Sequence, residues 1–202
     1  MKLTLGEIKS SVRRLCFLEA SEYAEYEEAV NEAANYALLQ LAKEFPITES
    51  LKIEKTQRST LSLDIAEMAE AAGFDFMGFD EDFPVLKTGE EGVPLPGKYT
   101  LLKDRYLILE PEETGIFTVF YSVYPQKITS LTPNEHEIEF AAEIASLMPL
   151  LMAWRIFKDD DEVKAALYFN EYNQAKAETK AHEPFKREGF KLGFWQQEGA
   201  FL

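Results

Sequence analysis

Residues 99–124 read YTLLKDRYLILEPEETGIFTVFYSVY, and this stretch carries the pattern from which we predict the central strands of the chain. Its first two apolar runs are separated by Lys103-Asp104, a polar pair typical of a tight turn. A second polar turn at 113–115 leads into residues 116–124, where aromatic and β-branched side chains predominate. The pattern predicts three consecutive strands joined by short turns, which is an antiparallel β-meander.

The segment before this meander changes pattern several times. An extended segment is predicted around residues 51–53, a short helix over 63–72 and a half-buried strand over 74–79. Residues 80–98 contain three of the nine prolines and three glycines, so they predict a long loop. Such a loop exceeds the usual connection length, which suggests either disorder or a role in an assembly.

Two helices are predicted before the strands. Leu5, Ile8 and Val12 recur at helical spacing after Thr4, a residue type that caps helix N-termini. A longer amphipathic helix is predicted from a cap at Ser21 to about residue 44, where a proline follows and ends it.

Two more helices are predicted after the strands. The first begins at residues 132–134 and continues to about Phe157, and Pro149 inside it is expected to cause a kink. Residues 158–161 (KDDD) end that helix and cap the next one. Because the connection is short, the two helices should pack as an αα-hairpin.

These patterns predict the α+β class, with N-terminal helices, a central antiparallel β-meander, a C-terminal αα-hairpin and an extended aromatic arm. We expect one domain over residues 1–180. It comprises helices at 4–44, a strand-rich insert at 47–130 and the helical hairpin at 135–180, and the arm follows at 181–202.

Composition narrows the range of partners. The chain of 202 residues carries 36 acidic and 21 basic side chains, a formal net charge of -15. This balance argues against a surface that neutralises phosphates or docks on an anionic membrane. Residues 64–91 alone carry nine acids and one lysine, which either line a channel that repels DNA or simply favour solubility. The apolar stretch at 140–157 is interrupted by charges and a proline, so we expect a core helix and no membrane span.

No constellation of catalytic residues is recognisable. His136 and His182 have no second histidine or cysteine at ligand spacing, and common nucleotide-binding and hydrolase motifs are absent. Residues 159–161 are interpreted as a helix cap, residues 80–82 as a solvated loop and Cys16 as a packed thiol. We therefore expect no enzymatic activity, no catalytic residues, no cofactor and no metal.

The C-terminal arm contains side chains suited to contact. Its aromatic residues lie among glycines and charges, and aromatic side chains dominate the energetics of interfaces. The alternative is a tail that folds back across its own domain. The candidate partner-binding residues are Phe185, Phe190, Phe194, Trp195 and Phe201.

Several segments resemble the head–tail adaptor (connector) proteins of tailed bacteriophages and prophages. LTLGEIKSSVRRL and YEEAVNEAANYALLQLAKEFPI are similar to their first two helices, and YTLLKDRYLILEPEETGIFTVFYSVYPQKIT is similar to their strands. The best match, AAEIASLMPLLMAWRIFKDDDEVKAALYFNEYNQAKAE, resembles their closing helical hairpin.

This resemblance implies a non-enzymatic virion structural subunit of an oligomeric ring at the virion neck, assembled in the host cytoplasm. Such a ring joins the portal protein to tail or stopper proteins, and DNA only passes through its channel. A C-terminal segment of these adaptors commonly engages the portal, which would suit the aromatic arm. The alternatives are a tail-completion or terminator protein and, from a different class, an acidic DNA-mimic inhibitor. Whether the isolated chain is monomeric stays open.

Overall fold

The computed structural model describes residues 2–17, 23, 26–88 and 94–182. The chain divides into two compact units, which we describe separately. The helical unit comprises Met1–Ala33 and Pro133–Leu202, and the β unit comprises Ala34–Thr132. Helices and antiparallel sheets are both present, which confirms the predicted α+β class.

The helical unit begins with α1 (Leu5–Cys16). Thr4 caps this helix, as predicted: its hydroxyl accepts a hydrogen bond from the backbone N–H of Glu7, and the Glu7 carboxylate accepts one from the N–H of Thr4. Leu5, Ile8 and Val12 are buried on the side of α1 that packs against α6 (Met148–Phe157). The helical spacing of these three residues is therefore the pattern of a core face.

The predicted helix start at residues 132–134 is wrong. Helix begins only at α5 (Ala142–Ala145), and the preceding residues run in an irregular path beside the N-terminus of α1. The backbone N–H of Leu5 donates to the carbonyl of His136, and that of Ile138 donates to the carbonyl of Leu3. The first N–H groups of a helix have no partner within the helix, and this segment satisfies some of them.

Pro149 does not lie in the interior of a helix, where it was predicted. The helical path is interrupted after α5, and α6 starts anew at Met148, so that Pro149 occupies the first turn of α6. Proline is tolerated there because its missing N–H would have no intrahelical partner. The residue therefore marks a helix start and does not kink a helix interior.

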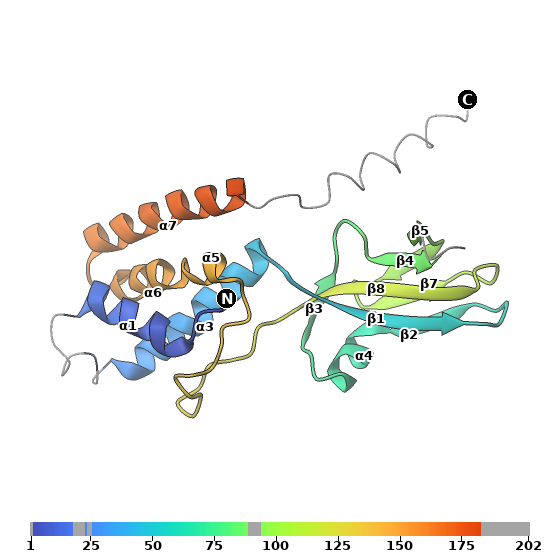
Figure 1. Ribbon diagram of the computed structural model, residues 1–202, viewed down its shortest axis with the longest axis horizontal. Coiled ribbons are helices and arrows are strands. Elements are labelled where there is room, and N and C mark those ends of the chain that lie inside the picture. Colours follow the sequence, from blue (N-terminus) through green and yellow to red (C-terminus); the bar gives the residue numbers. More distant parts are fainter. Residues whose placement is uncertain (1, 18–22, 24–25, 89–93, 183–202) are drawn as a thin grey trace. The chain divides into compact units, whose positions relative to one another are not determined.

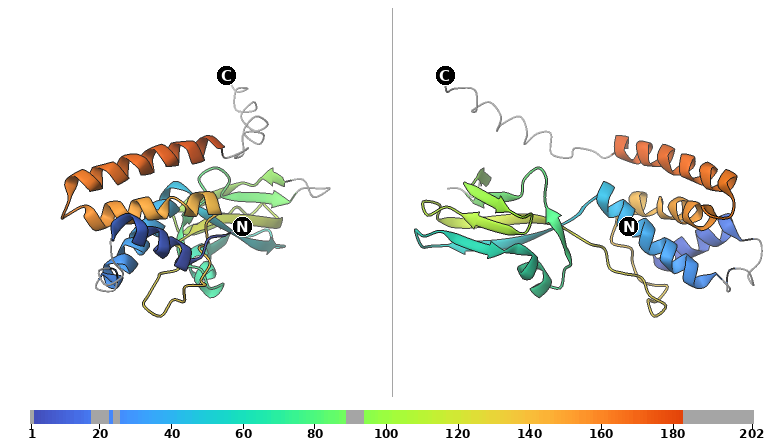
Figure 2. Two further views of the ribbon diagram at one scale, coloured as in Figure 1. Left: turned by 60° about the vertical axis from the view of Figure 1, so that its left-hand side comes forward. Right: turned by 180° about the vertical axis from the view of Figure 1, so that it is seen from behind.

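The predicted αα-hairpin is confirmed. Helix α7 (Glu162–His182) lies along α6 in every view (Figures 1 and 2). The rings of Trp154 and Phe169 lie 5.3 Å apart between centroids, and those of Phe157 and Tyr168 stack at 5.9 Å. Aromatic pairs at these distances add to the stabilisation that burial provides.

Helix α3 (Glu27–Glu44) crosses from the helical unit into the β unit. Its predicted cap, Ser21, lies outside the described residues. In the β unit, Asn35 of α3 forms a closed pair of hydrogen bonds with the backbone of Ile128: its amide nitrogen donates to the carbonyl, and its amide oxygen accepts from the N–H, both at 2.8 Å. This pair ties the chain after the last strand to the helix before the first.

The larger sheet of the β unit is built around β8 (Gly115–Val123). One edge of β8 pairs antiparallel with β1 (Ile47–Lys55) over nine residues, from Ile47 opposite Val123 to Lys55 opposite Gly115. Its other edge pairs with β3 (Phe76–Phe79) and β4 (Val85–Thr88), and β4 pairs in turn with β5 (Pro94–Pro96). Two of these strands, β4 and β5, lie in the segment 80–98, so the prediction of a long loop there is wrong.

The smaller sheet has the order β2–β7–β6, formed by Leu61–Asp64, Tyr106–Leu109 and Tyr99–Leu102. Strands β6 and β7 form the predicted hairpin, and Lys103 and Asp104 adopt positive φ in its turn. Strand β7 pairs with β2, however, whereas β8 belongs to the other sheet. The predicted meander is therefore limited to its first two strands.

Side chains from both sheets and from α4 (Ile65–Ala71) share one core. Residues Phe117, Val119 and Tyr121 of β8 alternate along the strand and point into this core. Gly73, at φ +88°, follows α4 where the predicted short helix was expected to stop. The buried members are Ile53, Ile65, Ala69, Val85, Leu107, Leu109, Phe117, Val119, Tyr121 and Val123.

Lys55 is a buried cation that closes the connection between the two sheets. Only 3% of the residue is exposed, and its ammonium group donates hydrogen bonds to the carbonyls of Glu110, Pro111 and Glu113. These carbonyls belong to the turn between β7 and β8. A buried ammonium with three acceptors is satisfied, and it fixes the point where the chain passes from one sheet to the other.

We expect Lys55→Met to lower the free energy of unfolding by about 3 kcal/mol, because hydrogen bonds to a buried charge are lost and carbonyls are left unpaired. Urea denaturation followed by circular dichroism measures this change. Lys52→Met is the matched control, since Lys52 lies on the same strand with an exposed side chain and should change stability little. Equal effects of the two substitutions would contradict the assignment.

Candidate interaction surfaces

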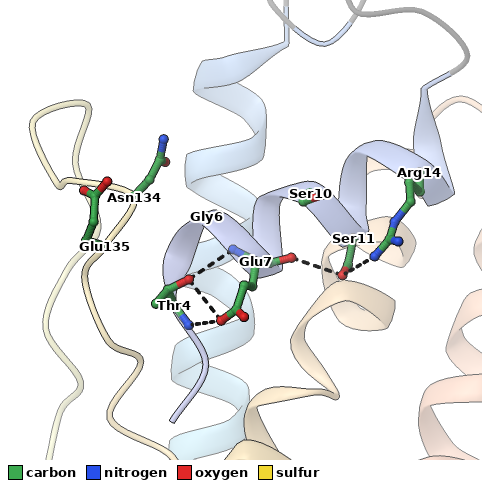
Figure 3. Close-up of a pocket in the computed structure, with 8 residues that line it drawn as sticks. All are labelled: Thr4, Gly6, Glu7, Ser10, Ser11, Arg14, Asn134 and Glu135. Carbon is green, nitrogen blue, oxygen red and sulfur yellow. Dashed lines mark hydrogen bonds between the residues drawn. The ribbon is translucent and has the colours of Figure 1, made fainter.

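The helical unit has an open polar hollow along α1 (Figure 3). Its volume is about 560 Å³. Hydrogen bonds run along the helix beneath it: Ser11 donates its hydroxyl hydrogen to the carbonyl of Glu7, and Arg14 donates to the Ser11 hydroxyl. The backbone N–H and hydroxyl of Thr4 hold the pKa of the Glu7 carboxyl below its usual value. These polar groups form hydrogen bonds with one another. We therefore interpret the lining of the hollow as the stabilised N-terminus of α1.

The opposite wall of this hollow comes close because residue 6 is a glycine. The N–H of Gly6 donates to the carbonyl of Asn134 at 2.8 Å, and a Cβ at position 6 would lie 3.1 Å from both the Cβ and the carbonyl oxygen of Asn134. Figure 3 shows Asn134 and Glu135 on the segment that faces α1. A larger residue at position 6 would push this segment away.

A second hollow lies beside α4 in the β unit and has a volume of about 690 Å³. Exposed Phe74 forms part of its lining, and Glu70, Asp75 and Arg105 carry charges around it. Arg105 is held in place by Asp64, because its Nε donates to both carboxylate oxygens at 2.8 Å. The same carboxylate caps α4 by accepting from the N–H of Glu67.

A third, more apolar hollow of about 350 Å³ lies between α3 and the residues that follow β8. Leu39 and Tyr124, each 41% exposed, lie at its border. The pair of hydrogen bonds between Asn35 and Ile128 holds its two sides together. The hollow has the lining of a small contact site and contains no converging charged groups beyond Asp75 and Lys127.

Helix α7 presents an exposed row of uncharged side chains, which sequence reasoning missed. We call it the α7 outer row. The sequence analysis predicted only the packing between the two helices of the hairpin. The signal for this row was nevertheless present, because its members recur alternately four and three residues apart in the sequence. Its members are Val163, Leu167, Asn170, Gln174, Ala177 and Ala181, and all six are exposed.

The sequence-predicted contact residues Phe185, Phe190, Phe194, Trp195 and Phe201 lie outside the described residues. The side chain of His182 is also outside the description. His136 lies in the irregular segment before α5, and its backbone carbonyl accepts from Leu5.

Two of the acidic runs have structural roles. Asp161 caps α7 by accepting from the N–H of Lys164 at 3.0 Å, and this hydrogen bond lowers the pKa of the Asp161 carboxyl. The interpretation of residues 159–161 as a helix cap is confirmed. Asp80 is buried and accepts hydrogen bonds from the N–H groups of Asp82 and Phe83, so the interpretation of residues 80–82 as a solvated run is wrong for Asp80. It organises the turn that precedes β4.

Within the described part of the chain, no group of three His, Cys, Asp or Glu side chains is placed to hold a metal ion. No described helix has the length and apolar character needed to cross a bilayer. The sequence matches no model of a known protein family and shows no detectable similarity to any curated protein.

The Cys16 thiol should react slowly. Burial raises its pKa to about 12, and the nearby Lys164 ammonium only partly offsets this rise. At pH 8 the thiolate fraction is then about a thousandfold lower than for an ordinary cysteine with a pKa of about 8.5. Because Cys16 is the only cysteine, its labelling by a chromogenic disulfide can be followed directly. We expect labelling at least a hundredfold slower in the native protein than in urea, and equal rates would contradict a packed thiol.

The ion pair between Asp64 and Arg105 should make stability depend on pH. The hydrogen bonds from Arg105 lower the pKa of Asp64 in the folded state, so its contribution is present above the unfolded pKa of about 3.9. This contribution is lost as the pH falls through the lower folded-state pKa. We therefore expect Asp64→Asn to lower Tm at pH 6 and the difference from the native protein to shrink towards pH 2.

Asp104→Asn is the matched control, because Asp104 lies exposed in the turn beside Arg105. Its Tm should follow that of the native protein throughout the titration. A difference between the native protein and Asp64→Asn that stays constant with pH would show that the carboxylate acts only through its shape.

Proposed function

We propose that the protein is a structural subunit of a phage or prophage head–tail connector ring, which joins the portal protein to the tail and forms part of the DNA channel. The observation that carries this proposal is the α6–α7 hairpin. It is the segment where the resemblance to head–tail adaptors is best, and its Asp161 caps α7 at the turn between the two helices. Aromatic packing between α6 and α7 makes this hairpin a rigid platform.

The charge distribution also supports a channel subunit. Exposed carboxylates of the β unit, among them Glu67, Glu70, Asp75 and Glu81, contribute to the formal net charge of -15. A surface with this charge repels the phosphates of DNA and leaves the polymer free to move. The same surface would weaken any binding of DNA as a ligand.

The aromatic arm provides the contact with the portal in this proposal. It follows directly from α7, so the helical hairpin would carry the arm to its partner. Aromatic residues supply much of the binding energy at protein interfaces, which suits the composition of this arm.

We expect deletion of residues 183–202 to leave folding unchanged and to abolish binding to the portal protein of the same phage. Circular dichroism and thermal melting check the fold, and co-purification followed by electron microscopy of the mixture checks ring formation. Normal binding by the truncated protein would contradict a role of the arm. Co-purification with a tail-tube protein instead would support a terminator, and stoichiometric capture of a DNA-binding protein would support a DNA mimic.

Two full-length variants separate aromatic contact from charge. In the first, Phe185, Phe190, Phe194 and Trp195 are replaced by Ser, and binding should be lost. In the second, Lys186, Arg187, Glu188 and Lys191 are replaced by Gln, and most binding should remain. The opposite pattern would show that charges hold the arm.

A further inference from the structure

The α7 outer row has the geometry of a helix-pairing seam. Its six residues follow one another at intervals of four and three, which places them in a single line on a helix that meets another at a shallow angle. Helix α7 has 21 residues, so the seam extends over about 30 Å. In Figure 1 the helix lies at the outside of the helical unit, with α6 along one side.

The α7 outer row exposes uncharged and apolar side chains, which is unusual for a helix surface that faces water. Val163 is 81% exposed and Leu167 is 53% exposed, whereas Ala165 and Tyr172 on the inner side of the same helix are buried. Charged residues make up 28% of the chain, yet none occurs at the six positions of the row. Water-facing helix surfaces are normally rich in charge, so a charge-free line with two large apolar side chains indicates a contact surface.

We propose that this row pairs with the same row of a second copy of the chain, with the two α7 helices antiparallel. The large side chains lie in the first half of the row and the small ones in the second half. An antiparallel arrangement places Val163 opposite Ala181 of the second copy and Leu167 opposite Ala177 of the second copy. Each layer then joins one large and one small residue, which keeps the helix separation uniform.

The centre of the row is also self-complementary. The same register places Asn170 opposite Gln174 of the second copy, and the two-fold axis repeats this pair. Both amides carry donors and acceptors, so they can satisfy one another when water is excluded. In the free protein the Gln174 amide nitrogen donates to Glu178 at 3.2 Å, which leaves its carbonyl oxygen for the new contact.

Charges beside the row favour the antiparallel register at its ends. Lys164 comes opposite Glu178 of the second copy, twice by symmetry, while Glu171 meets only its own counterpart. In the free protein the Lys164 ammonium lies 3.4 Å from Asp161, in an exposed pair that stabilises little and that can rearrange. The two ion pairs act mainly on orientation, and the buried apolar side chains provide the affinity.

A parallel pair fits less well. It would place Val163 and Leu167 against their own counterparts at one end, and Ala177 and Ala181 against theirs at the other. Helices joined in this way would be forced apart at one end and leave a gap at the other, which loses packing contacts. Size complementarity therefore selects the antiparallel orientation.

This pairing stands independently of the proposed connector function. A two-fold contact between identical surfaces closes on itself and cannot repeat around a ring, so the pair belongs to the free subunit. One helix pair buries less than the roughly 1,200 Å² of standard interfaces, so we expect a dimer that dissociates at micromolar concentrations. Entry into a ring would then require the two copies to separate.

Disulfide trapping tests both the contact and its orientation. One protein carries Cys16→Ser with Leu167→Cys, and another carries Cys16→Ser with Ala177→Cys. Under mild oxidation we expect a cross-linked dimer in the mixture and little in either protein alone, because the two positions face each other only in the antiparallel pair. Rapid cross-linking of the Leu167→Cys protein alone would overturn the orientation, and no cross-linking in any sample would overturn the contact.

Light scattering of the unmodified chain over a range of concentrations gives the second readout. We expect Leu167→Glu to weaken dimerisation at least tenfold, because it places a charge in the seam. Glu171→Gln is the matched control beside the seam and should strengthen dimerisation, since it removes the one like-charge contact. A chain that stays monomeric up to about 0.5 mM, or equal dissociation constants for both variants, would overturn the proposal, and thermal melts confirm that both variants fold.

Discussion

The β unit depends on the pairing of β8 with strands on both of its edges. Strand β1 covers one edge over nine residues, and β3 and β4 share the other, so β8 has no free edge where these strands lie. Its residues Phe117, Val119 and Tyr121 are almost fully buried and fill the space between the two sheets. Each such side chain contributes about 1.5–3 kcal/mol when it leaves water, which makes this strand the main source of cohesion.

Polar groups decide where the chain turns between these layers. Lys55 holds the carbonyls between β7 and β8, and Asp80 binds the backbone that leads into β4. Arg105 binds the carboxylate that caps α4. Each of these groups forms several hydrogen bonds, which offset the cost of its burial or immobilisation. These hydrogen bonds fix the conformation of the turns, as packing fixes that of the core.

The helical unit combines a closed inner surface with an open outer one. Aromatic rings and buried aliphatic side chains join α7 to α6, while the opposite side of α7 exposes Val163 and Leu167. The inner surface makes the hairpin rigid, and in our proposals this hairpin would carry both the portal-binding arm and the seam for a second α7 helix. If both proposals hold, a second copy would cover the outer row of α7 in the free protein, and the two copies would separate when the subunit enters a ring.

Local patterns in the sequence determined the elements that depend on neighbouring residues. The cap at Thr4, the turn at Lys103-Asp104 and the strand that became β8 were all readable, because capping, turn chemistry and β propensity act over a few positions. Three features could not be predicted from local patterns: β8 pairs with β1 and not with β7, residues 133–141 lie beside α1, and Asp80 is buried. These outcomes depend on contacts between residues that are distant in the sequence. The α7 outer row could be identified only from the structure, in which α6 packs against the opposite face of α7. Sequence spacing describes which side chains share a surface, whereas packing determines which of those surfaces remains open.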